Sequence, residues 1–305
     1  MHIFVTGATG YIGHAVVGEL AAAGHAVTGL VRSDARAEQV RRLGARAVVG
    51  DISDPVTYRR HAEEHDALVH TAFDYGPGGG PAADRIAVET LIAAAARDGR
   101  KRSLVYTSGI WVLGATGRAP AFEGAPTDHP AALVAWRPEH ERLVLEAGVH
   151  HLASAVIRPG IVYGGRGGLV GSYFESAEKE GAATYVGDGS NRIPMIHLED
   201  LARFYARVIE HRASGVFHAV DGNGVQLAEV ARAASEAAGS GGATRSVPIE
   251  QARQTLGPFA DCLALDQLVE SRRAAELGWR PEHSNFLGEA ARAYQEWKSA
   301  QAPGQ

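Results

Sequence analysis

The sequence has almost no cysteine and no long hydrophobic run. Its single cysteine among 305 residues, Cys262, excludes an intramolecular disulfide and a cysteine-based zinc site, and we expect it to be a small buried side chain. No stretch approaches the ~20 consecutive apolar residues of a membrane-spanning helix. No targeting segment precedes the first apolar run. We therefore expect a cytoplasmic protein with no membrane partner.

An excess of basic residues is also missing. The chain has 30 Lys and Arg against 35 Asp and Glu, a formal net charge of -5. A face that binds nucleic acid through its phosphates would be basic. The composition therefore predicts no nucleic-acid partner, and its 45% hydrophobic and 21% charged residues are typical of a globular protein with a sizeable core.

Short apolar runs alternate with helical patterns in the first half of the chain. The predicted strands are 2–6, 26–31, 47–49, 67–72, 103–108 and 153–158. The predicted helices between them are 12–23, 34–43, one that runs through Ile92 and Ala96, and one that ends at Ala147. This order predicts βαβ crossovers and an α/β fold, a Rossmann-type doubly wound parallel sheet.

The pattern changes after about residue 165, where glycine-rich loops and short helices take over. We expect residues 1–165 to form the Rossmann domain, with residues 195–220, including a helix over 198–210, returning to it. Residues 166–194 and 221–305 are then a smaller, mostly helical C-terminal lobe that binds substrate.

A glycine-rich turn follows the first strand and opens the first helix. Gly7 allows the tight turn, Gly10 lets the backbone approach a pyrophosphate, and Gly13 lets the helix pack closely on the sheet. The free N–H groups and the dipole of the helix start favour the phosphate charge. The predicted cofactor-binding residues of this loop are Gly7, Thr9, Gly10, Tyr11, Ile12 and Gly13.

The end of the second strand predicts which dinucleotide binds. An NAD site usually carries an acidic residue there, but this chain has Val31 followed by Arg32, and an arginine suits the 2′-phosphate of NADP(H). Asp51 and Ile52, after the third strand, are expected beside the adenine ring. The alternative for Arg32 is an ordinary solvated side chain.

Several further motifs, in this order, resemble the extended short-chain dehydrogenase/reductase family of the NAD-dependent epimerase/dehydratase type. They are the glycine loop, Gly50-Asp51-Ile52, Val69-His70-Thr71-Ala72, Tyr106-Thr107-Ser108-Gly109, Arg158-Pro159-Gly160 with Val162-Tyr163-Gly164, Ile196-His197-Leu198-Glu199-Asp200 and Glu276-Leu277-Gly278-Trp279-Arg280-Pro281. The resemblance implies further cofactor contacts from Thr71, Ala72, Thr107, Ser108, Arg137, Pro159, Gly160 and Val162. It gives His197 a structural role.

The serine, tyrosine and lysine on which this family's chemistry usually rests are missing. Matching the motifs puts Gly109 at the serine position, Leu133 at the tyrosine position and Arg137 at the lysine position. Pro138 is tolerated in a first helical turn but breaks a helix interior. We therefore expect the helix to begin near Pro138, with Leu133 and Arg137 in a loop or kinked turn.

Three residues are candidates to replace the missing acid: Tyr75, His140 and Ser108. Tyr75 follows the fourth strand, where parallel sheets place ligands, although it also fits the rim of a pocket. Histidine as a residue type suits a general acid at neutral pH, which makes His140 a candidate, although any one of 14 histidines is more often structural. Ser108 has a hydroxyl that hydrogen-bonds a carbonyl or the backbone. The predicted substrate contacts are Tyr75, Gly109, Trp111, Trp136, Tyr163 and Asn191.

These features predict an NADPH-dependent oxidoreductase that reduces a small carbonyl, enone or imine compound without the usual catalytic set. Arg137 is expected to contact the cofactor or to bind an acidic substrate. A redox-neutral epimerase or dehydratase of a sugar nucleotide, and a non-catalytic NADP(H) sensor, are the alternatives. We expect no metal, and a monomer or a homodimer.

Overall fold

The computed structural model describes residues 1–73, 80–148, 151–283 and 285–301. The chain divides into two units. Unit 1 contains Met1–Ser108, Trp136–Arg158 and Leu201–Phe217, and unit 2 contains Gly109–Ala135, Pro159–Asp200 and His218–Gln305. None of the described helices is long and apolar enough to cross a membrane.

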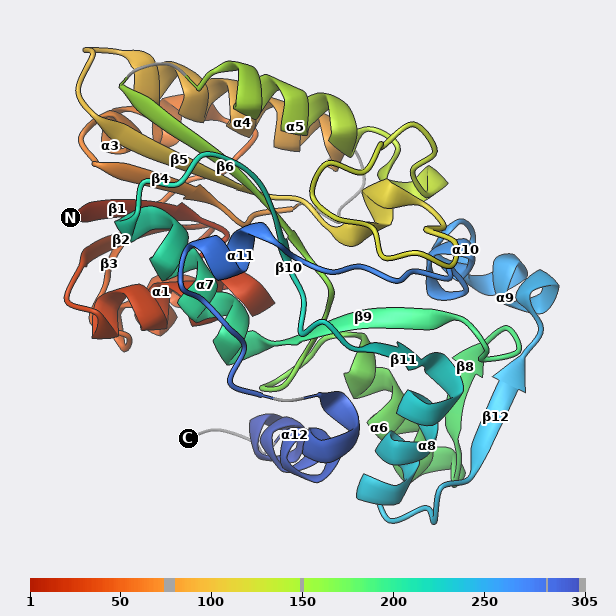
Figure 1. Cartoon of the computed structure of the whole chain (residues 1–305). Helices are drawn as coiled ribbons and strands as arrows, with labels where there is room; N and C mark the ends of the chain where they lie inside the picture. The colour runs from red at the N-terminus through yellow and green to blue at the C-terminus, as the bar shows by residue number, and fades with distance from the viewer. Residues whose placement is uncertain (74–79, 149–150, 284, 302–305) are drawn as a thin grey trace. The chain divides into compact units, whose positions relative to one another are not determined.

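A seven-stranded sheet forms the centre of unit 1 (Figure 1). Its strands are β1 (His2–Thr6), β2 (Ala26–Val31), β3 (Arg46–Val49), β4 (Ala67–His70), β5 (Arg102–Thr107), β6 (Leu152–Pro159) and β10 (Gly215–Ala219). They lie in the order β10-β6-β5-β4-β1-β2-β3, and the pairings from β3 through β6 are parallel. This is the Rossmann order, so the predicted fold class is confirmed.

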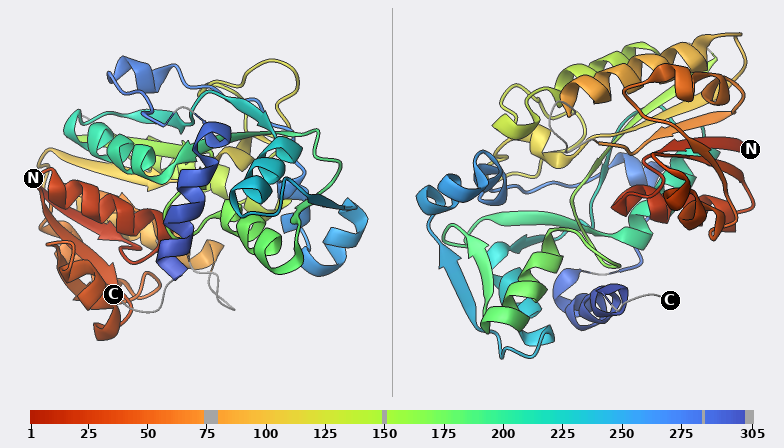
Figure 2. Two further views of the ribbon diagram at one scale, coloured as in Figure 1. Left: turned by 90° about the horizontal axis from the view of Figure 1, so that it is seen from below. Right: turned by 180° about the vertical axis from the view of Figure 1, so that it is seen from behind.

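Helices cover both faces of this sheet, which explains its apolar strands. The helices are α1 (Tyr11–Ala22), α2 (Asp34–Arg41), α3 (Arg59–Glu63), α4 (Pro81–Ala96), α5 (Arg137–Glu146) and α7 (Leu198–Glu210), with a 3-10 turn at Pro55–Thr57. Helices α4 and α5 lie side by side on one face, and α1 and α7 lie on the other (Figures 1 and 2). Ile3, Phe4 and Val5 of β1 are fully buried between the two layers.

The order of strands reverses between β1 and β4, which are hydrogen-bonded neighbours with Thr6 opposite His70. In open parallel sheets, ligands bind at such a point, outside the carboxyl ends of the strands. The carboxyl ends of β1 and β4 carry the glycine loop and the segment Thr71–Phe73. The fold therefore places the glycine loop, predicted to bind the cofactor, at this edge.

Unit 2 is built from two small sheets and several helices. Its strands are β7 (Ile161–Tyr163), β8 (Ala183–Val186), β9 (Arg192–His197), β11 (Gly224–Gln226) and β12 (Thr244–Val247). Its helices are α6 (Leu169–Glu180), α8 (Leu227–Ala237), α9 (Ile249–Leu256), α10 (Phe259–Leu263), α11 (Arg273–Glu276) and α12 (Phe286–Gln301), with 3-10 turns at Ile110–Leu113 and Ala132–Val134. Strands β11, β9 and β7 form one sheet, and β12 pairs with β8. Aromatic side chains of α6 and α12, including Phe174, Phe286 and Trp297, pack in its core.

Candidate active site

The glycine loop has no room for side chains at Gly7 and Gly13, two of its three predicted key positions. A Cβ at Gly7, where φ is +71°, would lie 2.7 Å from the backbone of Ala72. A Cβ at Gly13 would lie 2.5 Å from Thr71 Oγ1 and closer still to Gly7 O. The first turn of α1 carries no acidic side chain, and its cap, Gly10, offers no side-chain hydrogen bond. These residues therefore fit a dinucleotide whose pyrophosphate lies against the backbone.

Basic side chains lie beyond the end of β2. Arg32, the first residue after the strand, is exposed. Arg36, on α2, is also exposed and donates from Nη1 to Thr9 Oγ1 of the glycine loop at 3.5 Å. Asp51 lies after β3, and hydrogen bonds from Ser53 hold its pKa below the usual value. Sequence analysis missed Arg36, which a search for basic residues one helical turn beyond Arg32 would have found.

A buried polar cluster lies under this edge of the sheet in unit 1. We call His70, Asp84, Tyr106 and His140 the Asp84 cluster. Asp84, on α4, is 1% exposed. Its Oδ1 lies 3.2 Å from His70 Nε2, and its Oδ2 lies 2.7 Å from His140 Nδ1 and 2.9 Å from the Tyr106 hydroxyl. On the far side of His70, Nδ1 lies 2.6 Å from the Thr6 hydroxyl.

The hydrogen bonds of this cluster keep Asp84 ionised. Burial acts to raise the pKa of Asp84, but hydrogen bonds from His140 and His70 and the charge of Arg137 outweigh it and hold the pKa well below the usual value. Burial raises the pKa of Tyr106 well above its usual value, so that its hydroxyl keeps its proton. The cluster is therefore a carboxylate surrounded by donors. It is a functional candidate that sequence analysis missed except for His140.

Helix α5 begins at Arg137, and Pro138 lies in its first turn. A helix start near Pro138 is therefore confirmed, since a proline there removes no helical hydrogen bond. Arg137, expected in the preceding loop, is instead the first residue of the helix. Leu133 lies in the separate 3-10 turn Ala132–Val134 and is 41% exposed. The residues at the family's tyrosine and lysine positions are thus not on one continuous helix.

The Arg137 side chain is fixed at the end of β5. Its Nη1 donates to Thr107 O at 2.9 Å and to the Tyr106 hydroxyl at 3.3 Å. Its guanidinium carbon lies 4.5 Å from the centre of the Trp136 ring and 5.3 Å from that of Phe73, and these two rings stack. Trp136, predicted to contact substrate, therefore contacts Arg137.

Two hydroxyls end β5, and they differ in their partners. Thr107 Oγ1 lies 2.5 Å from the Tyr205 hydroxyl, so it is already used within unit 1. Ser108 donates its backbone N–H to Ile157 O, but its Oγ is buried and has no hydrogen-bond partner within the described residues. Ser108 therefore fits a role in ligand binding better than Thr107 does.

The predicted substrate contacts of unit 2 divide into core residues and residues with open space. Tyr163 is fully buried and packs edge-on against His197 and Phe286. Asn191 is 7% exposed, and its Nδ2 donates to the carbonyls of Leu263 and Leu265. Asn191 therefore holds unit 2 together, and Tyr163 packs in its core, where its hydroxyl has no hydrogen-bond partner within the described residues. Their contacts with substrate stay predictions.

Trp111 and Gly109 differ in the space around them. Trp111 lines a small, mostly apolar cavity of about 10 Å³ inside unit 2, and Phe259 packs edge-on against its ring. A Cβ at Gly109 would meet open space, so that a side chain at the family's serine position has room. Tyr75 lies outside the described residues.

The segment that resembles the nicotinamide side also lies in unit 2. A Cβ at Gly160 would lie 2.7 Å from Pro194 O, because Ile161–Tyr163 pairs closely with β9. Pro159 and Val162 flank this glycine. The need for glycine here is thus explained by strand packing, and the cofactor contacts of Pro159, Gly160 and Val162 stay predictions.

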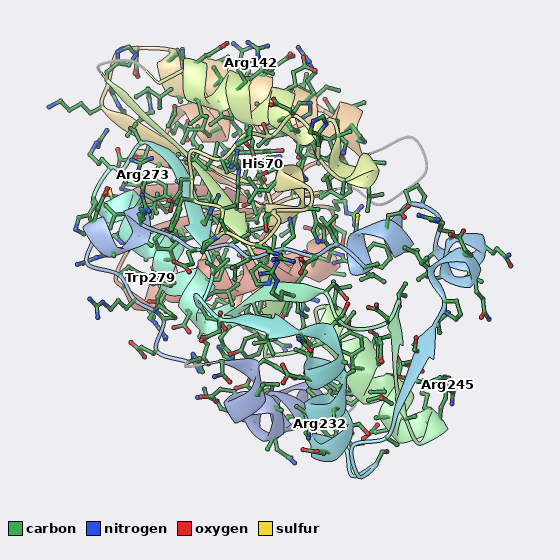
Figure 3. All side chains as sticks on the ribbon, turned by 45° about the vertical axis from the view of Figure 1, so that its right-hand side comes forward. His70, Arg142, Arg232, Arg245, Arg273 and Trp279 are labelled. Atoms are coloured by element: carbon green, nitrogen blue, oxygen red, sulfur yellow. The ribbon has the colours of Figure 1, made fainter. Side chains whose placement is uncertain are left out.

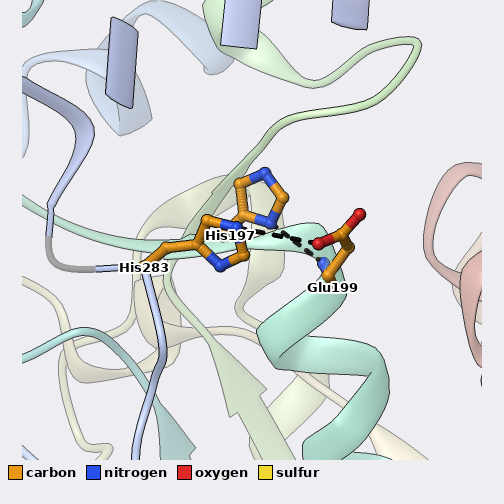
Figure 4. A group of neighbouring side chains, drawn as sticks. All are labelled: His197, Glu199 and His283. Atoms are coloured by element: carbon orange, nitrogen blue, oxygen red, sulfur yellow. Dashed lines mark hydrogen bonds and ion pairs between the residues drawn. The ribbon is translucent and has the colours of Figure 1, made fainter. Parts of the chain in front are cut away.

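Unit 2 contains a second histidine cluster. We call His197, Glu199, Asp200, His283 and Glu296 the Asp200 cluster. The ligand atoms of His197, Glu199 and His283 lie within 4.8 Å of one another, as metal ligands would (Figure 4). Asp200 is fully buried, and its carboxylate accepts from the backbone N–H groups of Glu282 and His283 and from His283 Nδ1.

The geometry of these two histidines argues against a metal ion. Their rings stack 3.6 Å apart and nearly parallel, and because nitrogen lone pairs lie in the ring planes they do not converge on one ion. His197 Nδ1 accepts from the Glu199 N–H, and His197 Nε2 lies 3.3 Å from Glu296. Burial and the neighbouring His283 lower the pKa of His197. We therefore assign the Asp200 cluster a structural role.

Comparison with known proteins agrees with the geometry of the glycine loop. A family model described as NAD(P)H-binding matches residues 7–212. The chain belongs to this NAD(P)H-binding family. Its ligand is thus a nicotinamide dinucleotide, as the glycine loop predicted.

Two relatives of this NAD(P)H-binding protein are named as reductases. The 3-diazoavenalumate denitrifying reductase of a Streptomyces species is 30% identical, over 94% of this chain and 98% of its own. The 2-alkyl-3-oxoalkanoate reductase of Stenotrophomonas maltophilia is 31% identical, over 70% of this chain and 67% of its own.

Solved structures share the fold. The human epimerase family protein SDR39U1, with NADPH, superposes with a TM-score of 0.79 at 20% identity, covering 97% of this chain and 99% of its own. The UDP-glucose 4-epimerase of Thermus thermophilus, with NAD, superposes with a TM-score of 0.80 at 22% identity, covering 98% of this chain and all of its own. The resemblance to the extended short-chain dehydrogenase/reductases is therefore confirmed for the fold.

Proposed function

We propose that this NAD(P)H-binding protein is an NADPH-dependent reductase of a small carbonyl, enone or imine compound. One observation carries the redox part: a relative named as a reductase matches nearly the whole of both chains. Bound NADPH would supply the hydride. The protein's own residues then hold the substrate, exclude water and supply a proton.

The preference for NADPH rests on Arg32 at the end of β2, with Val31 where NAD-binding sites usually carry an acid. We expect Arg32→Ala to weaken NADPH binding about 10- to 100-fold, because charge-assisted hydrogen bonds to the 2′-phosphate are lost, and to leave NADH binding unchanged. Nicotinamide fluorescence titrations measure both affinities. Arg41→Ala, at the end of the following helix α2 and also exposed, is the control. Equal losses for both dinucleotides would contradict the preference.

For the proton we propose His140. Asp84 accepts from Nδ1–H, as an orienting carboxylate does, and leaves Nε2, which makes no hydrogen bond within the described residues, as the donor. We expect His140→Gln to lower kcat by about 10²- to 10³-fold, with NADPH affinity unchanged. His211→Gln, an exposed histidine of unit 1, is the control. If Tyr75→Phe abolishes turnover and His140→Gln does not, Tyr75 is the acid instead.

Mixing the protein with NADPH and a panel of ketones, enones and imines tests the function itself. We expect loss of the nicotinamide absorbance in step with substrate consumption. A panel without any loss, in protein that binds NADPH, counts against a reductase and favours a sensor. Release of an isomerised or dehydrated sugar nucleotide without net loss of NADPH favours the epimerase or dehydratase alternative.

A further inference from the structure

The guanidinium of Arg137 is held in place by hydrogen bonds from only one of its three nitrogens. Its Nη1 donates to Thr107 O and to the Tyr106 hydroxyl, and its face contacts the Trp136 ring. An arginine has five N–H donors in a planar fork. Those on Nε and Nη2 make no hydrogen bond or ion pair within the described residues. The protein thus presents a fixed cation with part of its fork open.

The buried Asp84 carboxylate does not pair with the remaining N–H donors of Arg137 within the described residues. Asp84 already accepts from His70, His140 and the Tyr106 hydroxyl. Arg137 reaches Asp84 only through that hydroxyl, which donates to the carboxylate and accepts from Nη1. The Asp84 cluster therefore positions the cation while its own acceptors are taken by other donors.

A second donor without a partner within the described residues is the hydroxyl of Ser108, the residue that follows the Arg137 contact at Thr107. The Thr107 carbonyl that accepts from Arg137 belongs to the peptide bond leading into Ser108. Ser108 is 9% exposed, and its Oγ has no partner within the described residues. A buried hydroxyl without a partner destabilises the protein, and a bound ligand that accepts from it would remove this cost. Both groups lie at the carboxyl end of β5, where parallel sheets bind ligands.

We propose that Arg137 and Ser108 bind the carboxylate of an anionic substrate. The open fork and one hydroxyl match a planar carboxylate, and one unpaired cation suits a singly charged anion. The proposal rests on the proposed reductase function and adds that its substrate carries a carboxylate. His140 lies three residues after Arg137 on the same face of α5, so the carboxylate and the proton donor would be neighbours.

Benzoate and its neutral analogue benzamide test the site without turnover. Titration is followed by tryptophan fluorescence, because the Trp136 ring lies 4.5 Å from the guanidinium carbon, with and without NADP⁺. We expect benzoate to bind at least about 50-fold more tightly than benzamide. Arg137→Gln should remove this difference, and Ser108→Ala should reduce benzoate affinity about 10-fold. Arg142→Gln, on the outer side of α5, should behave as the wild type (Figure 3).

The controls separate this proposal from the reductase function. Benzoate binding that depends on Arg137 supports the site even if no substrate is reduced. Equal affinity for benzoate and benzamide overturns it, even if a neutral ketone is reduced. Arg137→Gln that weakens NADP⁺ binding but not benzoate binding also overturns it, in favour of a cofactor contact. Arg137→Lys, which keeps the charge and loses the fork, should retain only part of the benzoate selectivity and serves if the glutamine variant fails to fold.

Discussion

The Asp84 cluster of unit 1 and the Asp200 cluster of unit 2 are built from the same types of side chain, histidines around a buried aspartate. In the Asp200 cluster both nitrogens of His197 are engaged, and Asp200 is met by backbone N–H groups as well as by His283. In the Asp84 cluster the carboxylate is equally satisfied, but His140 Nε2 and part of the neighbouring Arg137 fork have no partner within the described residues. A closed network of this kind stabilises a fold, whereas an open one leaves groups for a ligand.

Removing the central carboxylate of the closed cluster should have the largest effect. We expect Asp200→Ala to lower the free energy of unfolding by about 3–5 kcal/mol, since it leaves the buried His283 side chain and the backbone N–H groups of Glu282 and His283 without their acceptor. Urea unfolding measures the loss. Glu236→Ala, which breaks an exposed helical ion pair, should cost less than about 1 kcal/mol. A loss for Asp200→Ala as small as this control would remove the contrast between the clusters.

The matching change in the open cluster should affect chemistry more than folding. The amide of Asp84→Asn keeps only one acceptor oxygen, so it cannot accept from two histidines and a tyrosine as the carboxylate does. His140 therefore loses its orientation. We expect kcat to fall about 100-fold and stability by about 1–3 kcal/mol, with NADPH affinity within ~3-fold. Steady-state kinetics and cofactor titration measure these quantities. Glu89→Gln, exposed on the same helix α4, is the control. Unchanged kcat would make this cluster structural too.

The carboxyl of Asp221, in unit 2, adds a pH-dependent test to the comparison of the two clusters. Burial raises the pKa of Asp221 from 3.8 to about 7. Hydrogen bonds from Asn223 act to lower this pKa, and the charge of Asp200 acts to raise it. Between these values the folded chain holds a proton that the unfolded chain releases, so stability falls as pH rises. We expect this group to lower the free energy of unfolding by about 1–3 kcal/mol as the pH rises from 4 to 8. Asp221→Asn should flatten that slope, measured by urea unfolding across the range. An unchanged slope would assign the pH dependence to other groups.

Local sequence signals predicted the framework of unit 1 well. The bounds of β1, β2 and α7 match the expected ranges, because each element has a continuous apolar or periodic pattern bounded by turn residues. The glycine loop was predictable because its backbone conformation requires particular residues. The start of α5 was predictable for the same reason, since Pro138 restricts where a helix can begin.

The Asp84 cluster was not predicted, because its bonds join residues far apart in the sequence. Asp84 bonds His70 across 14 residues, Tyr106 across 22 and His140 across 56. One local signal was available. Asp84 falls on the same helical face as Ala87, Val88 and Leu91, which are all buried, and a lone acid on an apolar face predicts a buried partner.

Asn191 and Tyr163 were assigned to substrate for the same reason that Asp84 was missed. Asn191 donates to carbonyls 72 and 74 residues away, and the packing of Tyr163 against Phe286 also comes from a distant segment. The resemblance placed these residues correctly along the chain but carried no information about their side-chain partners. Their burial depends on the whole fold.

Pro138 limits how this chain could evolve. A serine at Gly109 meets open space, and Arg137→Lys changes one side chain, so both steps toward the family's usual catalytic set are sterically simple. A tyrosine at Leu133 would still stand on a separate 3-10 turn, because Pro138 lies in the first turn of the following helix. On the predicted matching of these positions, Leu133→Tyr and Arg137→Lys would place their side chains on one continuous helix only if Pro138 were replaced as well.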